Sequence, residues 1–199
     1  MSQLKLKHSG GNSVIIAAPS SNPASDRTIT LPTTADGTLL TTTNPKAGNI
    51  IQVVQTVKSD TFSHTGNTSV TDVTGLNVTI TPSSSSNKVL LLCFMNISNN
   101  NISRVQFVRG TTAIGIPSAA GNRPVGTASM NNGGDTNVTD NLTMIFLDSP
   151  ATTSATTYKV SFSNELNSSE FSVNRTRGDL NSIVGVRTIS TITAMEVAA

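Results

Sequence analysis

The side chains that could do chemistry are few and lie far apart in this sequence. Neither His8 nor His64 stands beside a nucleophile-elbow pattern, so a Ser-His-Asp hydrolase is not indicated. Asp135 and Asp140 flank a loop rich in Gly and Asn, and with Asp148 they could offer oxygen ligands to calcium. Their spacing does not fit an EF-hand loop, and solvated turn residues are the more common reading. We therefore expect no enzyme, no cofactor and no bound metal.

The remaining reactive groups lead to the same expectation. A polysaccharide-cleaving enzyme needs a carboxylate pair, but the three glutamates, Glu165, Glu170 and Glu196, all fall in the last 35 residues without a supporting motif. Cys93 is the only cysteine, so no intrachain disulfide can form, and it lies in the most apolar stretch. We expect it to be a small buried hydrophobic residue.

Charge and hydropathy limit the partners. The 13 basic and 11 acidic residues give a net charge of +2 and no basic stripe, so nucleic acid is not an expected partner. No apolar run reaches transmembrane length, and the first residues lack the apolar core of a secretion signal. We expect a soluble protein that is made in a cytoplasm and does not insert into membranes.

The elements that must position the rest are organised around residues 87–98. As an extended strand, this stretch places Val89, Leu91, Cys93, Met95 and Ile97 on one face and Leu90, Leu92 and Phe94 on the other. A buried helical turn is the alternative, but the Ser and Asn clusters on both sides favour a strand. A strand that is apolar on both faces must be covered on both, by a second sheet or by a neighbouring subunit.

Composition predicts the fold class. The chain has 30 Thr, 26 Ser and 20 Asn, which suit strands and turns and disfavour helices. Residues 47–199 divide into about eight to ten short alternating strands that are separated by turn residues. This pattern predicts an all-β domain, an antiparallel β-sandwich of the jelly-roll type.

Residues 1–46 differ from that domain and predict an extended N-terminal arm. Their strands are short and are interrupted by Pro23, Pro32 and Pro45, so they cannot bury enough apolar surface alone. The arm needs a partner, which is the main domain, other copies of the same chain or a larger assembly. The candidate assembly residues are Leu4, Leu6, Val14, Ile15, Ile16, Ile29 and Leu31.

Residues 118–139 form the longest loop of the prediction. They are rich in Asn, Asp and Gly and nearly free of large apolar side chains. Loops of this length tend to be functional or disordered. The candidate binding residues in it are Asn122, Arg123, Asn131, Asn132 and Asp135.

Two groups of segments carry a resemblance to a known family. Residues 14–19 (VIIAAP), 28–32 (TITLP) and 35–40 (ADGTLL) resemble a pattern in tail-fibre and other virion proteins of marine tailed bacteriophages, including cyanophages. Residues 48–55 (GNIIQVVQ) and 190–197 (STITAMEV) look like the first and last strands of the jelly-roll domain of such proteins.

The resemblance implies a virion component that forms a homotrimer. It implies that the arm attaches to the particle and that the sandwich projects outward, as a tail fibre, a fibre adaptor or a head decoration. The partners would be other copies of the chain and other virion proteins of the tail or capsid. Leu90, Leu92 and Phe94 are then the candidate trimer strand, because three sandwiches around an axis would cover their face.

The alternative is a module that binds a host-surface glycan through residues 118–139. Sugar sites usually stack the ring on an aromatic side chain. The sequence has no Trp, one Tyr and six Phe, so composition weighs against this alternative.

Overall fold

The computed structural model describes residues 3–7, 9–17, 20–21, 45–66, 68–119 and 121–199. The chain divides into two compact units, Met1–Leu39 and Leu40–Ala199, and each is described by itself. The predicted boundary at residue 46 stays a prediction.

The first unit contains a β-hairpin. Strands β1 (Gln3–Lys7) and β2 (Ser13–Ala17) pair antiparallel, with Leu6 opposite Val14 and Leu4 opposite Ile16. Leu6, Ile15 and Ile16 each expose about half of their surface. An isolated two-stranded hairpin is marginally stable in water, so this unit has unused apolar surface. The predicted arm residues Ile29 and Leu31 lie outside the described residues.

The first sheet of the second unit is four strand positions wide. Its central strand is β6 (Lys88–Asn99), and β10 (Asp140–Asp148) pairs along one edge of β6. The other edge is shared by β13 (Ser190–Val197), which pairs with residues 88–94, and β12 (Glu170–Val173), which pairs with residues 97–99. Beyond them, β3 (Ile50–Lys58) pairs with β13 and β4 (Phe62–Thr65) pairs with β12.

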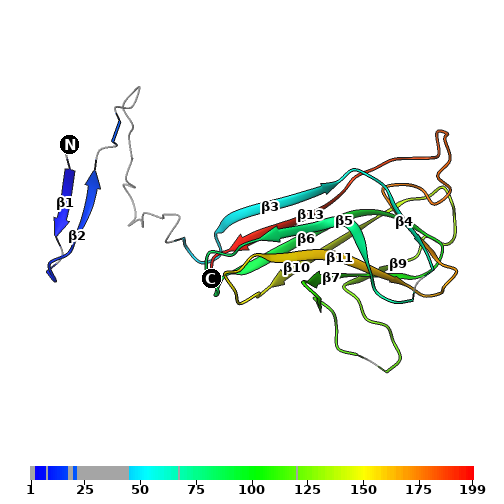
Figure 1. The fold of residues 1–199 in the computed structure, drawn as a ribbon, viewed down its shortest axis with the longest axis horizontal. Coiled ribbons are helices and arrows are strands. Elements are labelled where there is room, and N and C mark those ends of the chain that lie inside the picture. The colour runs from blue at the N-terminus through cyan, green and yellow to red at the C-terminus, as the bar shows by residue number, and fades with distance from the viewer. Residues whose placement is uncertain (1–2, 8, 18–19, 22–44, 67, 120) are drawn as a thin grey trace, which may run out of the picture. The chain divides into compact units, whose positions relative to one another are not determined.

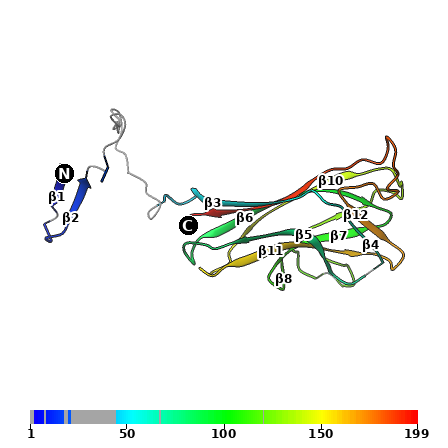
Figure 2. The ribbon, with the colours of Figure 1, turned by 45° about the horizontal axis from the view of Figure 1, so that its top comes forward.

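The second sheet has the same width. Strand β11 (Thr156–Asn164) pairs with β5 (Thr71–Ile80) on one side and with β7 (Ser103–Arg109) on the other. The far edge of β7 is shared by β8 (Thr112–Ile114) and β9 (Ala128–Met130). The two sheets lie face to face as the layers of a sandwich (Figures 1 and 2).

The strand order is that of a jelly roll. We count β3/β4, β8/β9 and β12/β13 as one position each, which gives eight positions along the chain. The sheets then have the orders 1-8-3-6 and 2-7-4-5. All connections cross between the sheets except the one from position 4 to 5, as in a double Greek key. The predicted fold class, an all-β antiparallel sandwich, is confirmed.

The core lies between the sheets and is built from alternate residues of the strands. On β6 the inward residues are those predicted from alternation, and each is at most 1% exposed: Val89, Leu91, Cys93, Met95 and Ile97. At one end of the core, Phe162 stacks on Phe171 at 4.2 Å between ring centroids. The ring of Phe62 meets Phe162 edge-on.

The buried amide of Asn174 lies where β3 ends and β4 begins, and where β12 ends and β13 begins. Asn174 follows β12 and adopts a positive φ of 62°. Its Nδ2 donates to the carbonyl oxygens of Lys58 and Asp60, between β3 and β4, at 2.8 and 2.9 Å. Its Oδ1 accepts a hydrogen bond from Ser190 Oγ at the start of β13. One side chain thus forms hydrogen bonds at both interruptions of the first sheet, between β3 and β4 and between β12 and β13.

A buried charged group links the two sheets at another point. Asp148, at the end of β10, accepts hydrogen bonds from Tyr158 Oη at 2.7 Å and from Arg109 Nη1 at 2.8 Å. Burial, and then the hydrogen bond to Asp148, raise the pKa of the Tyr158 hydroxyl. Asp148 is therefore a structural acceptor between the sheets.

Candidate functional site

The outer face of the first sheet is apolar over three rows of residues that cross all four strands. The strand registers define these rows from β3 through β13 and β6 to β10. They are Val53–Met195–Leu90–Leu147, Gln55–Thr193–Leu92–Ile145 and Val57–Thr191–Phe94–Thr143. We call these twelve residues the apolar face.

Much of this surface faces solvent. Ile145 is 62% exposed, Val53 57%, Val57 52%, Leu147 45% and Phe94 39%. The predicted trimer residues Leu90 and Leu92 are half-buried between them. Monomeric proteins rarely leave a contiguous apolar area of this kind uncovered, and such areas mark interaction sites.

The polar residues within the apolar face are compatible with burial in a contact. Gln55 Nε2 donates to Thr193 Oγ1 at 2.8 Å, so part of the amide's hydrogen-bonding need is already met. None of the twelve residues carries a charge. The first charged side chain beyond them on β6 is Lys88, which pairs with Val197 at one end.

The outer face of the second sheet has a different character. Lys159 pairs with Asp72 at 2.5 Å, and Ser161 donates to the same carboxylate at 2.6 Å. Thr79 and Thr157 share a hydrogen bond on the same side. One sheet of the sandwich therefore presents an uncharged apolar surface, and the other presents a polar, charged one.

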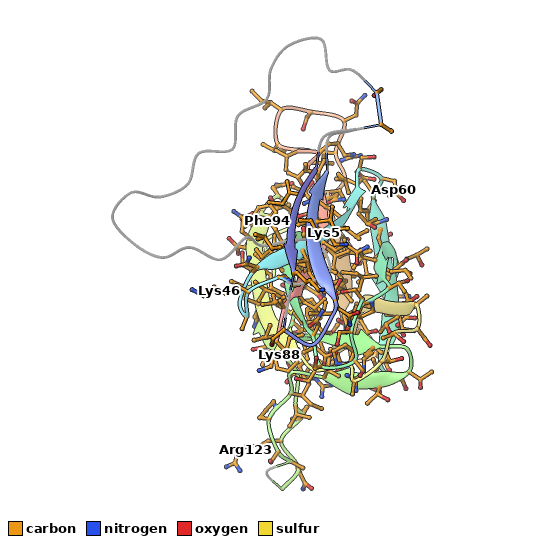
Figure 3. The ribbon with its side chains drawn as sticks, turned by 90° about the vertical axis from the view of Figure 1, so that its left-hand side faces the viewer. Lys5, Lys46, Asp60, Lys88, Phe94 and Arg123 are labelled. Carbon is orange, nitrogen blue, oxygen red and sulfur yellow. The ribbon has the colours of Figure 1, made fainter. Side chains whose placement is uncertain are left out.

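The predicted binding loop is divided by a strand. β9 pairs with β7 and separates Asn122 and Arg123 from the later group of candidate residues. Asn122 and Arg123 lie in a loop that projects from the sandwich, with Arg123 far out on it (Figure 3).

The later group of candidate residues is used in local structure. Asn132 exchanges hydrogen bonds with Asn99 at 2.8 and 2.9 Å. The side chains of Asn131 and Asp135 accept from backbone N–H groups two residues ahead. The five predicted residues therefore lie on two segments, one on each side of β9 in the chain.

The possible reactive groups have structural surroundings. Burial raises the pKa of the Cys93 thiol to about 12, which suppresses its thiolate. Asp140 accepts from Asn132, and Asp148 is held by Arg109 and Tyr158. Within the described residues, no three His, Cys, Asp or Glu side chains gather where they could hold a metal ion.

One strand prediction was wrong at its start. The sequence alone suggests that the last strand starts near residue 184, where a run of apolar residues separated by Ser and Thr begins, but β13 begins at Ser190, where the resemblance places the last strand. Residues 174–189 form a loop in which Asp179 pairs with both Arg175 and Arg187. These ion pairs, and the bridge between Arg175 and Arg187, turn the segment back on itself and leave Ile183 97% exposed.

Sequence reasoning missed two parts of the apolar face. It gave the alternation of β3 and β10 but did not place their outward residues beside those of β6. The register does so, with Leu147 opposite Leu90 and Ile145 opposite Leu92. The signal in the sequence was the apolar residue at both alternating positions of 144–147, the same double-sided pattern that marks β6.

Comparisons with known proteins add little beyond this. No protein-family model matches the chain, and no curated protein matches it. Among solved structures it is similar to a chain in a structure of infectious bursal disease virus Gt strain, with 15% identity and a TM-score of 0.37 over 95% of this chain and 48% of that one. It is also similar to a chain in a structure of the Gx strain, with 13% identity and a TM-score of 0.33 over 94% of this chain and 46% of that one. The chain thus spans about half the length of these matches. Within the described residues, no helix is long and apolar enough to cross a membrane.

Proposed function

We propose that this protein is a structural component of a bacteriophage virion that assembles as a homotrimer. The observation that carries the proposal is the uncharged apolar face on one side of an otherwise complete jelly roll. A sandwich needs only its inner faces to form a core. Five outward apolar side chains, each at least 39% exposed, are surplus to that need and fit a contact with other subunits.

The N-terminal hairpin supports the same proposal. Leu6, Ile15 and Ile16 are about half exposed on a two-stranded hairpin, and such hairpins are at best marginally stable by themselves. Such a unit gains stability when it pairs with another protein. Together with the virion-protein resemblance of residues 14–40, this suits an arm, residues 1–46, that attaches to the tail or capsid. The particle position that follows is a tail fibre, a fibre adaptor or a head decoration.

Particle incorporation tests the arm. We expect a chain that lacks residues 1–46 to fold as a sandwich but to be missing from particles assembled in cells where it replaces the full chain. In the full chain, Ile16→Asp should reduce incorporation, because it places a charge on an apolar part of the hairpin. Thr153→Asp, at an exposed loop of the sandwich, is the matched control. Undiminished incorporation of the shortened chain would show that the arm is not the anchor.

A further inference from the structure

We propose that the three copies pack with the β6–β10 side of the apolar face of one copy against the β3 side of the apolar face of the next. This inference rests on the proposed homotrimer and names its contact. The face would line the threefold axis, and each copy would use two different patches of one sheet.

The apolar side chains of the face form two patches, which Met195 joins in one of the three rows. The larger patch is formed by Leu90, Leu92, Phe94, Ile145 and Leu147 on β6 and β10. The smaller patch is Val53 and Val57 on β3. Strand β13 lies between them and presents Thr191 and Thr193 outward in two of the three rows.

Two patches suit a ring better than a twofold dimer. In a twofold dimer the same patch meets itself, so one patch is sufficient. In a closed ring each subunit meets one neighbour with one patch and the other neighbour with a second patch. Three sheets around an axis form a prism-like ring, in which one side edge of each sheet meets the opposite side edge of the next. The two edges of this sheet over the three rows are β10 and β3.

Charge complementarity fits another copy of this chain as the occupant. A partner that buried a charge against these three rows would leave that charge without a counter-ion. The outer face of the second sheet is a poor match, because its Asp72–Lys159 ion pair and its hydrogen-bonded Thr79 and Thr157 would lose their contact with water against an apolar surface. The apolar face itself meets the requirement, since its twelve residues are uncharged. Packing the β10 edge against the β3 edge also covers two strand edges that would otherwise invite aggregation.

The rows predict which residues meet. Rotation about an axis parallel to the strands keeps each row at its own height. Val53 and Leu147 end the same row on opposite edges. Leu147 of one copy should therefore lie against Val53 of the next.

A charge-swap experiment on the full chain tests this pairing by light scattering after size exclusion. The unaltered chain should have three times the 20.7 kDa mass of one copy. Leu147→Glu alone and Val53→Lys alone should each shift the population to monomer, because each buries one uncompensated charge. The double variant should recover the trimer, because every contact then has Glu opposite Lys. Asn77→Glu, exposed on the second sheet, is the matched control and should stay trimeric.

A disulfide experiment keeps the test valid if a charged variant fails to fold. A chain with both Leu147→Cys and Val53→Cys should give covalently linked trimers on oxidation, whereas Leu147→Cys alone should give none. Cys93 is 1% exposed and will not compete. Covalent dimers from Leu147→Cys alone, or a double charge variant that stays monomeric, would overturn the pairing. A trimeric unaltered chain in that case would leave the proposed function standing, whereas a monomeric one would overturn the homotrimer and with it this contact.

Discussion

Replacing Asn174 by alanine tests whether one buried amide holds both breaks in the first sheet. The side chain is fully buried and makes three hydrogen bonds, to Lys58, Asp60 and Ser190. Each such bond contributes about 0.5–1.5 kcal/mol net, and a carbonyl left buried without a donor costs more. The φ of 62° adds about 1 kcal/mol for alanine, because its Cβ disfavours the left-handed region. We expect a loss of roughly 3–5 kcal/mol in the free energy of unfolding.

Asn174→Gly separates the two contributions. Glycine loses the same hydrogen bonds but tolerates a positive φ, so it should be less destabilising than alanine by about 1 kcal/mol. Urea unfolding, followed by circular dichroism at a fixed protomer concentration, measures both variants. Asn181→Ala, at an exposed position of the same loop, should stay within about 0.5 kcal/mol of the unaltered chain. A loss below about 1 kcal/mol for alanine, or a larger loss for glycine than for alanine, would refute the reasoning.

Two further predictions concern the ends of the core. Burial raises the pKa of Glu196, but hydrogen bonds from Asn87 and Ser83 outweigh it and hold the pKa below the usual glutamate range. The stability from ionised Glu196 should therefore be present above about pH 4.3 and be lost as pH falls through the lowered pKa. In thermal unfolding, the Glu196→Gln variant should lack this loss of stability at acid pH. A variant whose stability falls with pH as steeply as that of the unaltered chain would contradict the prediction. Phe162→Ala removes a ring stacked 4.2 Å from Phe171 and should lower the free energy of unfolding by about 3–5 kcal/mol in urea; a loss below 1 kcal/mol would show that the stack is not part of the stable core.

The central strand could be predicted because its pattern is local. Alternation along residues 88–97 separates Leu91 and Cys93 from Leu90 and Leu92, and the structure buries the first pair in the core. The strand period of two requires this once one face is covered. The jelly-roll class followed from many short strands with turns between them, a property of composition and spacing.

The apolar face could not be read from the sequence because it depends on register. Val53 and Leu147 are 94 positions apart, and only the pairing of β3, β13, β6 and β10 places them in one row. The loop before β13 was not predicted, for a related reason. The apolar run from Val184 is typical of a strand, but ion pairs of Asp179 with two arginines hold residues 174–189 as a loop. Side-chain pairing overrode the local pattern.

The abundance of Asn and Ser and the scarcity of charge follow from one feature of the fold. Where β3 gives way to β4 and β12 to β13, backbone groups lose their sheet partners inside the protein, and short amide and hydroxyl side chains satisfy them. Asn99 Nδ2 likewise donates to the Met130 carbonyl and Asn164 Nδ2 to the Gly66 carbonyl, and Ser103 Oγ donates to Asn164 Oδ1 at 2.9 Å. These neutral groups satisfy the backbone without counter-ions, so the fold needs few charged residues. None of them lies in the three outer rows of the first sheet. An uncharged outer face on one sheet and a polar outer face on the other are then a specific arrangement, and the proposed contact between copies accounts for it.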